Sequence, residues 1–180
     1  MIEYYTFKHR GDSLDFLDEV YLTLIPSMTV AIFYGSHLSE GARSQALLFS
    51  EILNSDEAAK SISELNNVME EFLEQDSEYL LLRAVDKGIA CFRRGGVCAK
   101  IVRNGQISIL PNGYFELSRE DRLVCATSNF YKYLNDEGIL ADALVADSCS
   151  EWMNMMIRRI SDQNQLRCGN LSAVTLRLDN

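Results

Sequence analysis

The sequence is poor in the features that mark several large classes of protein. It has two prolines and ten glycines in 180 residues. The glycines follow no period, which excludes collagen-like and low-complexity chains. No segment approaches the ~18 consecutive apolar residues that cross a bilayer, and no basic segment followed by an apolar one opens the sequence. We therefore expect a soluble, cytoplasmic protein that does not engage membranes.

Basic residues are also scarce, with 17 Lys and Arg against 26 Asp and Glu and a net charge of -9. Binding to nucleic-acid phosphates needs clustered Lys and Arg, so this balance argues against a nucleic-acid partner. The five cysteines are odd in number and include no Cys-x-x-Cys pair, which predicts neither a disulfide framework nor a thiolate zinc site. Hydrophobic residues make up 47% of the chain, enough for a single packed domain over residues 1–180.

The hydrophobic pattern predicts three strands followed by two helices. Residues 2–8 and 19–25 are rich in aromatic and β-branched side chains, and residues 28–34 form a short apolar run. The first helix is expected over residues 40–53, and the second begins after Ser55, whose hydroxyl can cap it. Each helix has one apolar face at helical spacing. These faces comprise Ala42, Ala46, Phe49 and Leu53 in the first helix, and Ala58, Ile62, Leu65, Met69 and Phe72 in the second.

Short strands dominate the second half of the chain. Turns such as Asp86-Lys87, Gly95-Gly96 and Asn104-Gly105 suit hairpins because their residues tolerate positive φ. About ten strands exceed one small open sheet, so the sequence predicts an α+β fold with two antiparallel sheets face to face and helices outside both, a four-layer α/β/β/α sandwich. The later strands are expected over residues 79–85, 88–94, 97–102, 106–110, 114–117, 123–127 and 172–178, and a helix containing Trp152 over residues 148–162.

Four segments along this order of elements carry a family resemblance. They are residues 11–18, 33–36 (Phe-Tyr-Gly-Ser), 121–131 and 169–174. In order and spacing they resemble motifs of the metal-dependent serine/threonine phosphatases of the type-2C family, in its compact bacterial form. The corresponding family motifs include Gly-x-Arg-x-x-Asn-Glu-Asp, Phe-Asp-Gly-His and Asp-Asn-x-Ser/Thr-Val. The resemblance covers nearly the whole chain and implies the same sandwich fold.

The resemblance also implies which residues stand at the metal site. Such phosphatases hold two divalent cations on clustered aspartates, and the cations activate a water that attacks a phosphoryl group. Asp18 matches one metal ligand, and Gly35 matches a backbone-carbonyl ligand. The remaining positions have changed: Tyr34, Ser128 and Asn170 stand for three metal aspartates, Leu17 for a glutamate and Ser13 for the phosphate-binding arginine. A shift of one residue at the last position gives Gly169 or Leu171 and still no aspartate.

Loss of three carboxylates predicts a degenerate site. We expect no catalytic residues and no cofactor, and hence a pseudophosphatase that acts by binding a protein partner, with regulation as one form of that role. One alternative is a divergent, weakly active phosphatase that binds Mg²⁺ or Mn²⁺ weakly through Asp18. Another is a structural assembly subunit.

Candidate partner-binding residues lie where the third predicted strand ends. They are Tyr34, Ser36 and His37, together with Tyr133 from a neighbouring segment. Aromatic side chains of this kind anchor protein interfaces. Phe130 and Tyr131 either join this surface or pack under the end of the sheet. His37 could instead replace a lost metal ligand, although a solvated or helix-capping histidine is the simpler interpretation.

A further group of acidic residues is open to two interpretations. Asp86, Asp142 and Asp147 fall outside the predicted strands and helices. Acidic residues in turns are usually solvated, and a metal cluster is the alternative.

Overall fold

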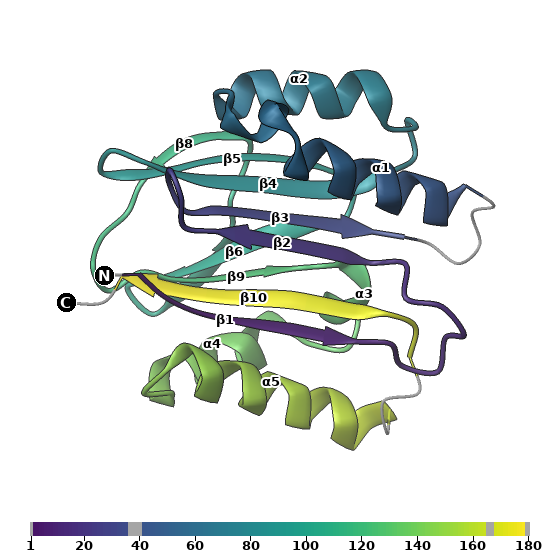
Figure 1. The fold of residues 1–180 in the computed structure, drawn as a ribbon. Coiled ribbons are helices and arrows are strands. Elements are labelled where there is room, and N and C mark those ends of the chain that lie inside the picture. Colours follow the sequence, from purple (N-terminus) through teal and green to yellow (C-terminus); the bar gives the residue numbers. More distant parts are fainter. Residues whose placement is uncertain (1, 36–40, 165–167, 179–180) are drawn as a thin grey trace.

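The computed structural model describes residues 2–35, 41–164 and 168–178, which form two five-stranded antiparallel sheets packed face to face (Figure 1). One sheet has the order β1-β10-β9-β6-β7 and the other β2-β3-β4-β5-β8. The first comprises β1 (Ile2–His9), β10 (Leu171–Leu178), β9 (Arg122–Ala126), β6 (Cys98–Arg103) and β7 (Gln106–Ile109). The second comprises β2 (Glu19–Thr23), β3 (Thr29–Tyr34), β4 (Glu78–Val85), β5 (Gly88–Arg94) and β8 (Gly113–Glu116).

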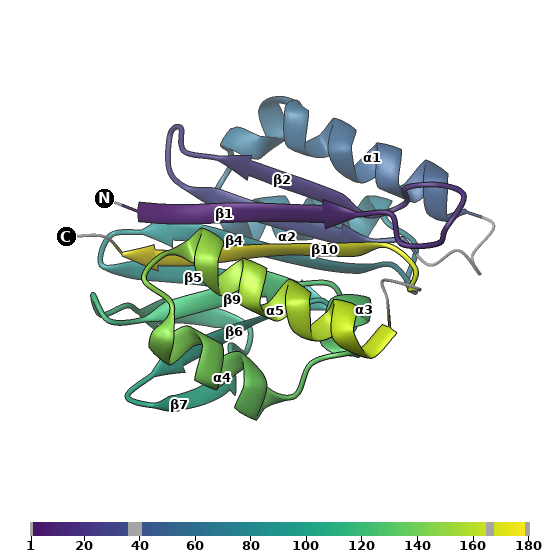
Figure 2. The ribbon, with the colours of Figure 1, turned by 90° about the horizontal axis from the view of Figure 1, so that it is seen from below.

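Helices cover the outer face of each sheet, which confirms the predicted four-layer α/β/β/α sandwich (Figures 1 and 2). On the β2-containing sheet lie α1 (Ala42–Asn54), the 3₁₀ turn η1 (Asp56–Ala59) and α2 (Ile62–Phe72). On the other sheet lie α4 (Asp136–Val145) and α5 (Cys149–Asn164), and the single turn α3 (Ser128–Tyr131) follows β9. Within the described residues, no helix is long and apolar enough to cross a bilayer.

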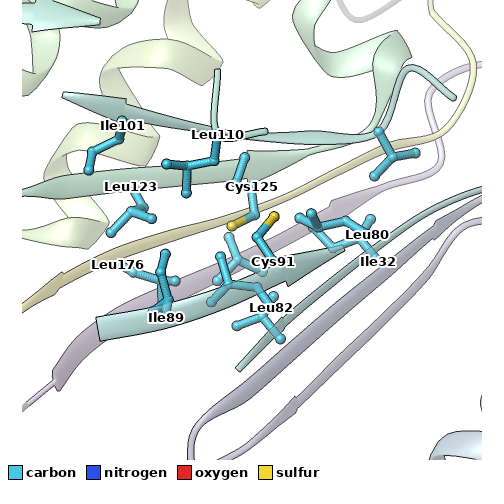
Figure 3. Packing of buried hydrophobic residues seen from close by; sticks show 14 of the residues in the cluster. Ile32, Leu80, Leu82, Ile89, Cys91, Ile101, Leu110, Leu123, Cys125 and Leu176 are labelled. Atoms are coloured by element: carbon cyan, nitrogen blue, oxygen red, sulfur yellow. The ribbon is translucent and has the colours of Figure 1, made fainter. Parts of the chain in front are cut away.

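Three apolar layers result from this stacking, one between the sheets and one under each pair of helices. Strand β4 shows how the sequence encodes them. Leu80 and Leu82 point between the sheets, whereas Tyr79 and Leu81 point toward α1 and α2. A strand covered on both faces has no polar alternation, which explains the apolar run from Tyr79 to Leu82 in β4. Figure 3 shows the layer between the sheets, where Cys91 from one sheet and Cys125 from the other lie side by side.

The second predicted helix is two elements rather than one. Ser55 caps the 3₁₀ turn, accepting a hydrogen bond from Glu57 N–H, and the chain then breaks before α2. Ser61 begins α2 through a capping box with Glu64. The predicted apolar face is also wrong at its end. Phe72 is 55% exposed, and Leu73, just after the helix, is buried instead.

Helix α4 was not predicted, and it changes the interpretation of Asp142. The helix begins at a cap in which Asn135 Oδ1 accepts the Gly138 N–H at 2.8 Å. Asp142 is buried on this helix, and its two carboxylate oxygens accept hydrogen bonds from Arg159 of α5, both at 2.7 Å. Asp142 is thus neither a solvated turn residue nor a metal ligand candidate, because the arginine occupies both of its oxygens.

The predicted turns are confirmed by their backbone angles. Asp86, Asn104, Gly95 and Gly105 have φ of 37°, 51°, 74° and 70°. All five cysteines are buried free thiols.

Candidate functional site

The positions implied by the family resemblance converge at one end of the sandwich (Figure 1). Asp18 directly precedes β2, Tyr34 ends β3, Asn170 directly precedes β10 and Ser128 begins α3 after β9. Strand pairing explains the convergence, since Ala126 at the end of β9 lies opposite Ala173 near the start of β10. Residues separated by more than 150 positions in sequence are thus brought to one edge.

Asp18 is fully buried and only partly hydrogen-bonded. Its Oδ1 accepts the Gly35 N–H at 3.3 Å, whereas its Oδ2 has no partner among the described residues. Burial raises the pKa of Asp18 to about 7, while Ser172, Gly35 and the charge of Lys8 act in the opposite direction. The Ser172 hydroxyl lies close enough to favour the charged form, but among the described residues its Oγ forms no hydrogen bond of good geometry. A proton therefore competes for this carboxylate near neutral pH.

Asn170 is also fully buried, and every polar atom of its side chain is used. Its Oδ1 accepts the Leu17 N–H at 2.5 Å, and its Nδ2 donates to the carbonyl oxygens of Arg10 and Asp15, both at 3.0 Å. Both amide hydrogens are donated to carbonyls, which a carboxylate could not do. Asn170 therefore holds the loop between β1 and β2 against the start of β10.

The same loop is packed closely against two other segments of backbone. Gly11, on the loop, has φ +65°, and a Cβ added there would lie 1.6 Å from the Cys168 carbonyl oxygen. Gly35 directly follows β3, and a Cβ added there would lie 2.4 Å from the carbonyl oxygen of Leu17 on the loop. Ser13, at the position of the family's arginine, is half-buried on this loop, and its N–H donates to the Arg10 carbonyl at 3.4 Å. The loop is thus in close contact with the segment that precedes β10 and the segment that follows β3.

Tyr34 lies half-buried beside other ionisable groups. Burial raises its pKa, and the nearby Asp18, Glu78 and Tyr133 raise it further. Glu78 is the cross-strand neighbour of Tyr34, and its carboxylate accepts the Gly96 N–H at 2.8 Å. Glu78 was not predicted as part of the site. Its position at the start of β4 was the available signal. Because β4 pairs antiparallel with β3, the start of β4 lies beside Tyr34 at the end of β3.

Ser128 joins this group through the turn at Gly96. A Cβ added to Gly96 would lie 2.8 Å from the Ser128 Cβ, so the two residues are in close contact. Among the described residues, no three His, Cys, Asp or Glu side chains form a group that could hold a metal ion.

The candidate partner surface is only partly described. Tyr34 and Tyr133 are half-buried at the site, whereas Ser36 and His37 lie outside the described residues. The second interpretation of Phe130 and Tyr131 is the correct one: they pack under the sheet end. Phe130 is fully buried, and the Tyr131 hydroxyl donates to the Val124 carbonyl at 2.7 Å.

Comparison with known proteins identifies the architecture. Neither a family model nor a curated protein matches the sequence. Among solved structures, the PP2C phosphatase domain of SpoIIE from Bacillus subtilis, solved with a regulatory fragment, has a TM-score of 0.76 at 14% identity, over 98% of this chain and 63% of that one. The chain has the type-2C phosphatase fold.

Other structures with the type-2C phosphatase fold match along their whole length. RsbX in complex with magnesium has a TM-score of 0.80 at 10% identity, over 99% of this chain and 96% of that one. A serine/threonine phosphatase of S. agalactiae has a TM-score of 0.77 at 14% identity, over 99% and 100% of the two chains. These likenesses confirm the fold implied by the four segments of sequence. The chemistry of this chain has to be argued from its own residues.

Proposed function

We propose that this chain is a pseudophosphatase, with the type-2C phosphatase fold, no phosphate hydrolysis, and a regulatory role exercised by binding another protein. The observation that carries the proposal is the use made of Asn170. Its amide hydrogens donate to two loop carbonyls at a position where the resemblance implies a metal-binding aspartate. Asn170 therefore offers no carboxylate to a cation, and its one amide oxygen already accepts the Leu17 N–H.

The remaining oxygen donors do not fit a pair of divalent cations. Hard cations such as Mg²⁺ and Mn²⁺ are bound mainly by several charged oxygens. Asp18 is the only carboxylate retained from the family set. Tyr34 supplies a phenol whose pKa is raised, so it stays neutral. The charge at these positions is therefore too small to hold two cations a few Å apart.

A second candidate function, weak metal-dependent phosphatase activity, is favoured by one specific observation. Asp18 Oδ2 is buried and has no partner among the described residues, although buried polar atoms are almost always hydrogen-bonded. A single cation bound by Asp18 would satisfy that oxygen. This candidate and the pseudophosphatase differ in whether a cation at Asp18 produces turnover.

Turnover assays with a matched variant separate the two candidates. We expect the purified protein to hydrolyse neither p-nitrophenyl phosphate nor a phosphoserine peptide in Mn²⁺ or Mg²⁺ above the level of Asp18→Ala. Both proteins need repurification in parallel, so that a contaminating phosphatase acts equally in the two samples. Metal-dependent turnover present in the wild type and absent from Asp18→Ala would overturn the pseudophosphatase proposal.

Partner binding is proposed for the surface that includes Tyr34 and Tyr133. Both side chains are half-buried, and the effect of Tyr133 on the Tyr34 pKa places them near each other. Partly held aromatic side chains lose little entropy on binding and often anchor interfaces. Ser36 and His37 remain candidates for the same surface.

Affinity purification from the native cell tests the surface. The double variant Tyr34→Ala/Tyr133→Ala is expected to lose partners that the wild type recovers. The matched control is Tyr4→Ala/Tyr114→Ala, which removes two tyrosines that are 40% and 52% exposed in other parts of the fold. Equal recovery by all three folded proteins would place the contact elsewhere.

A further inference from the structure

A cavity of about 550 Å³ opens between the two sheets at the end opposite Asp18. Strand pairing sets its position, since Ile2, at the start of β1, and Arg177, near the end of β10, line it. Residues of the turn between β4 and β5 and of the connection from β8 to β9 also line it. Its size falls within the range of ~300–1,000 Å³ typical of small-molecule sites.

The inner wall of this cavity is apolar. It comprises Ile2, Leu123 and Leu176 from one sheet, Ala84 and Ile89 from the other, and Met28 just before β3. Figure 3 shows Ile89, Leu123 and Leu176 within the layer between the sheets. Interiors rarely leave apolar space of this size unfilled, because its lining atoms lose their packing contacts. An apolar guest would restore those contacts.

A small residue keeps the cavity open on the β4 side. Ala84 lies opposite Ile89 in the β4–β5 pair, and both residues belong to the layer between the sheets. Ala84 offers only a methyl group to the cavity wall. A larger side chain at this position would therefore occupy part of the space.

The mouth of the cavity has an excess of positive charge. Lys87 and Arg119 line it, both are exposed, and neither forms a salt bridge with any described residue. Asp86 is the acidic residue of the lining. Arg177 is already paired with Glu3 and bound to the Asp147 carbonyl. In a chain with net charge -9, two unpaired cations beside an apolar opening point to an anionic headgroup.

We propose that this cavity binds a small free amphiphile, with its hydrocarbon chain between the sheets and a carboxylate or sulfate headgroup at Lys87 and Arg119. The hydrocarbon supplies affinity through burial, and the two cations determine the sign of the headgroup. The site is separate from Asp18 and does not depend on the pseudophosphatase proposal.

Binding of four probes to the intact chain tests the chemistry, with decanoate compared with acetate, decanol and decyltrimethylammonium by calorimetry and by thermal melting. We expect decanoate to bind and raise the melting temperature, because a ligand of the native state stabilises it. Decanol should bind more weakly, and acetate and the cationic amphiphile should leave the melting temperature unchanged. Equal binding of the anionic and cationic amphiphiles would overturn the proposal.

Two variants locate the site. Lys87→Gln/Arg119→Gln should weaken decanoate binding by about tenfold, since each exposed charge contact contributes modestly, and should leave decanol binding unchanged. The matched control Arg43→Gln/Arg158→Gln removes two exposed cations elsewhere and should bind decanoate normally. Ala84→Leu should abolish binding of both by filling the cavity. Undiminished decanoate binding in the folded Lys87→Gln/Arg119→Gln variant would overturn the assignment even if Ala84→Leu failed to fold.

Discussion

Two fully buried aspartates, Asp18 and Asp121, lie at opposite ends of the sandwich. Their pKa values are shifted in opposite directions. Asp121 accepts hydrogen bonds from Arg103 at 2.8 and 2.6 Å and from the Ser118 N–H at 2.6 Å. Burial alone would raise the Asp121 pKa, but Arg103 and Ser118 outweigh it and lower the pKa. Asp18 has the Gly35 N–H at 3.3 Å and no arginine, so burial prevails and raises its pKa to about 7.

Burial therefore decides the charge of a carboxylate only where hydrogen-bond donors and cations do not outweigh it. Asp121 is a structural anion that links the end of β6 to the start of β9 through its hydrogen bonds with Arg103. Asp18 forms no ion pair with any described residue, an arrangement more typical of functional sites than of structural ones. We therefore expect Asp18 and Asp121 to change the free energy of unfolding in opposite directions as pH rises.

The largest effect is expected from Asn170→Asp, which would add to Asp18 a second buried aspartate without an ion pair among the described residues. The new carboxylate would face the Arg10 and Asp15 carbonyls that Asn170 now binds. We expect the free energy of unfolding to fall by about 4 kcal/mol, measured by urea denaturation near pH 8. Asn129→Asp, which loses a single hydrogen bond to the Asn170 carbonyl, is the milder control. Full recovery of stability in millimolar Mg²⁺ would show that the end of the sandwich retains a metal site.

Asp18→Asn should instead increase the free energy of unfolding. The unfolded pKa of 3.8 and the folded pKa of about 7 mean that the wild type loses stability as pH rises between these values. The variant should show no such loss and should be more stable near pH 8 by about 3 kcal/mol, with little difference near pH 4. Urea denaturation across this range measures both curves. Parallel curves would mean that Asp18 is charged in the folded protein and has a cation.

Arg103→Met should remove the main group that lowers the pKa of Asp121. The lowered pKa of Asp121 adds stability above its unfolded value, and that stability is lost as pH falls through the folded pKa. Removing the arginine leaves the carboxylate buried and unpaired, at a cost of about 2 kcal/mol near pH 8. This estimate is modest because the Arg103 side chain is 44% exposed and the ion pair is screened by solvent. Arg158→Met, at an exposed position without an ion pair among the described residues, should change stability little.

Gly35→Ala should weaken the hydrogen bond from the Gly35 N–H to Asp18. The added Cβ would clash with the Leu17 backbone, so β3 or the loop must shift and the protein should lose about 1 kcal/mol. The shift should also move the Gly35 N–H away from Asp18, which raises the Asp18 pKa further. Titration of the Asp18 carboxyl by NMR measures this effect. Gly41→Ala is the matched control, since its Cβ would meet only the end of the Glu74 side chain.

Most strands and turns were predictable because they depend on neighbouring residues. The apolar run of β4 and the positive-φ residues at Asn104-Gly105 are local signals. Helix α4 was missed although Asn135, Asp136 and Glu137 form a good helix start. Its apolar face is short, and the burial of Asp142 on it depends on Arg159, 17 residues away.

The sequence by itself determined which residue types stand at the strand ends, and so the loss of most carboxylates expected of an active phosphatase. It also determined the two-sheet sandwich through its local hydrophobic pattern. Only the tertiary structure decided that Asn170 binds the loop 153 and 160 residues away, that Glu78 lies beside Tyr34, and that a cavity opens between the sheets. Desolvation and hydrogen bonding depend on which distant groups pack together, and the local sequence pattern does not predict that packing.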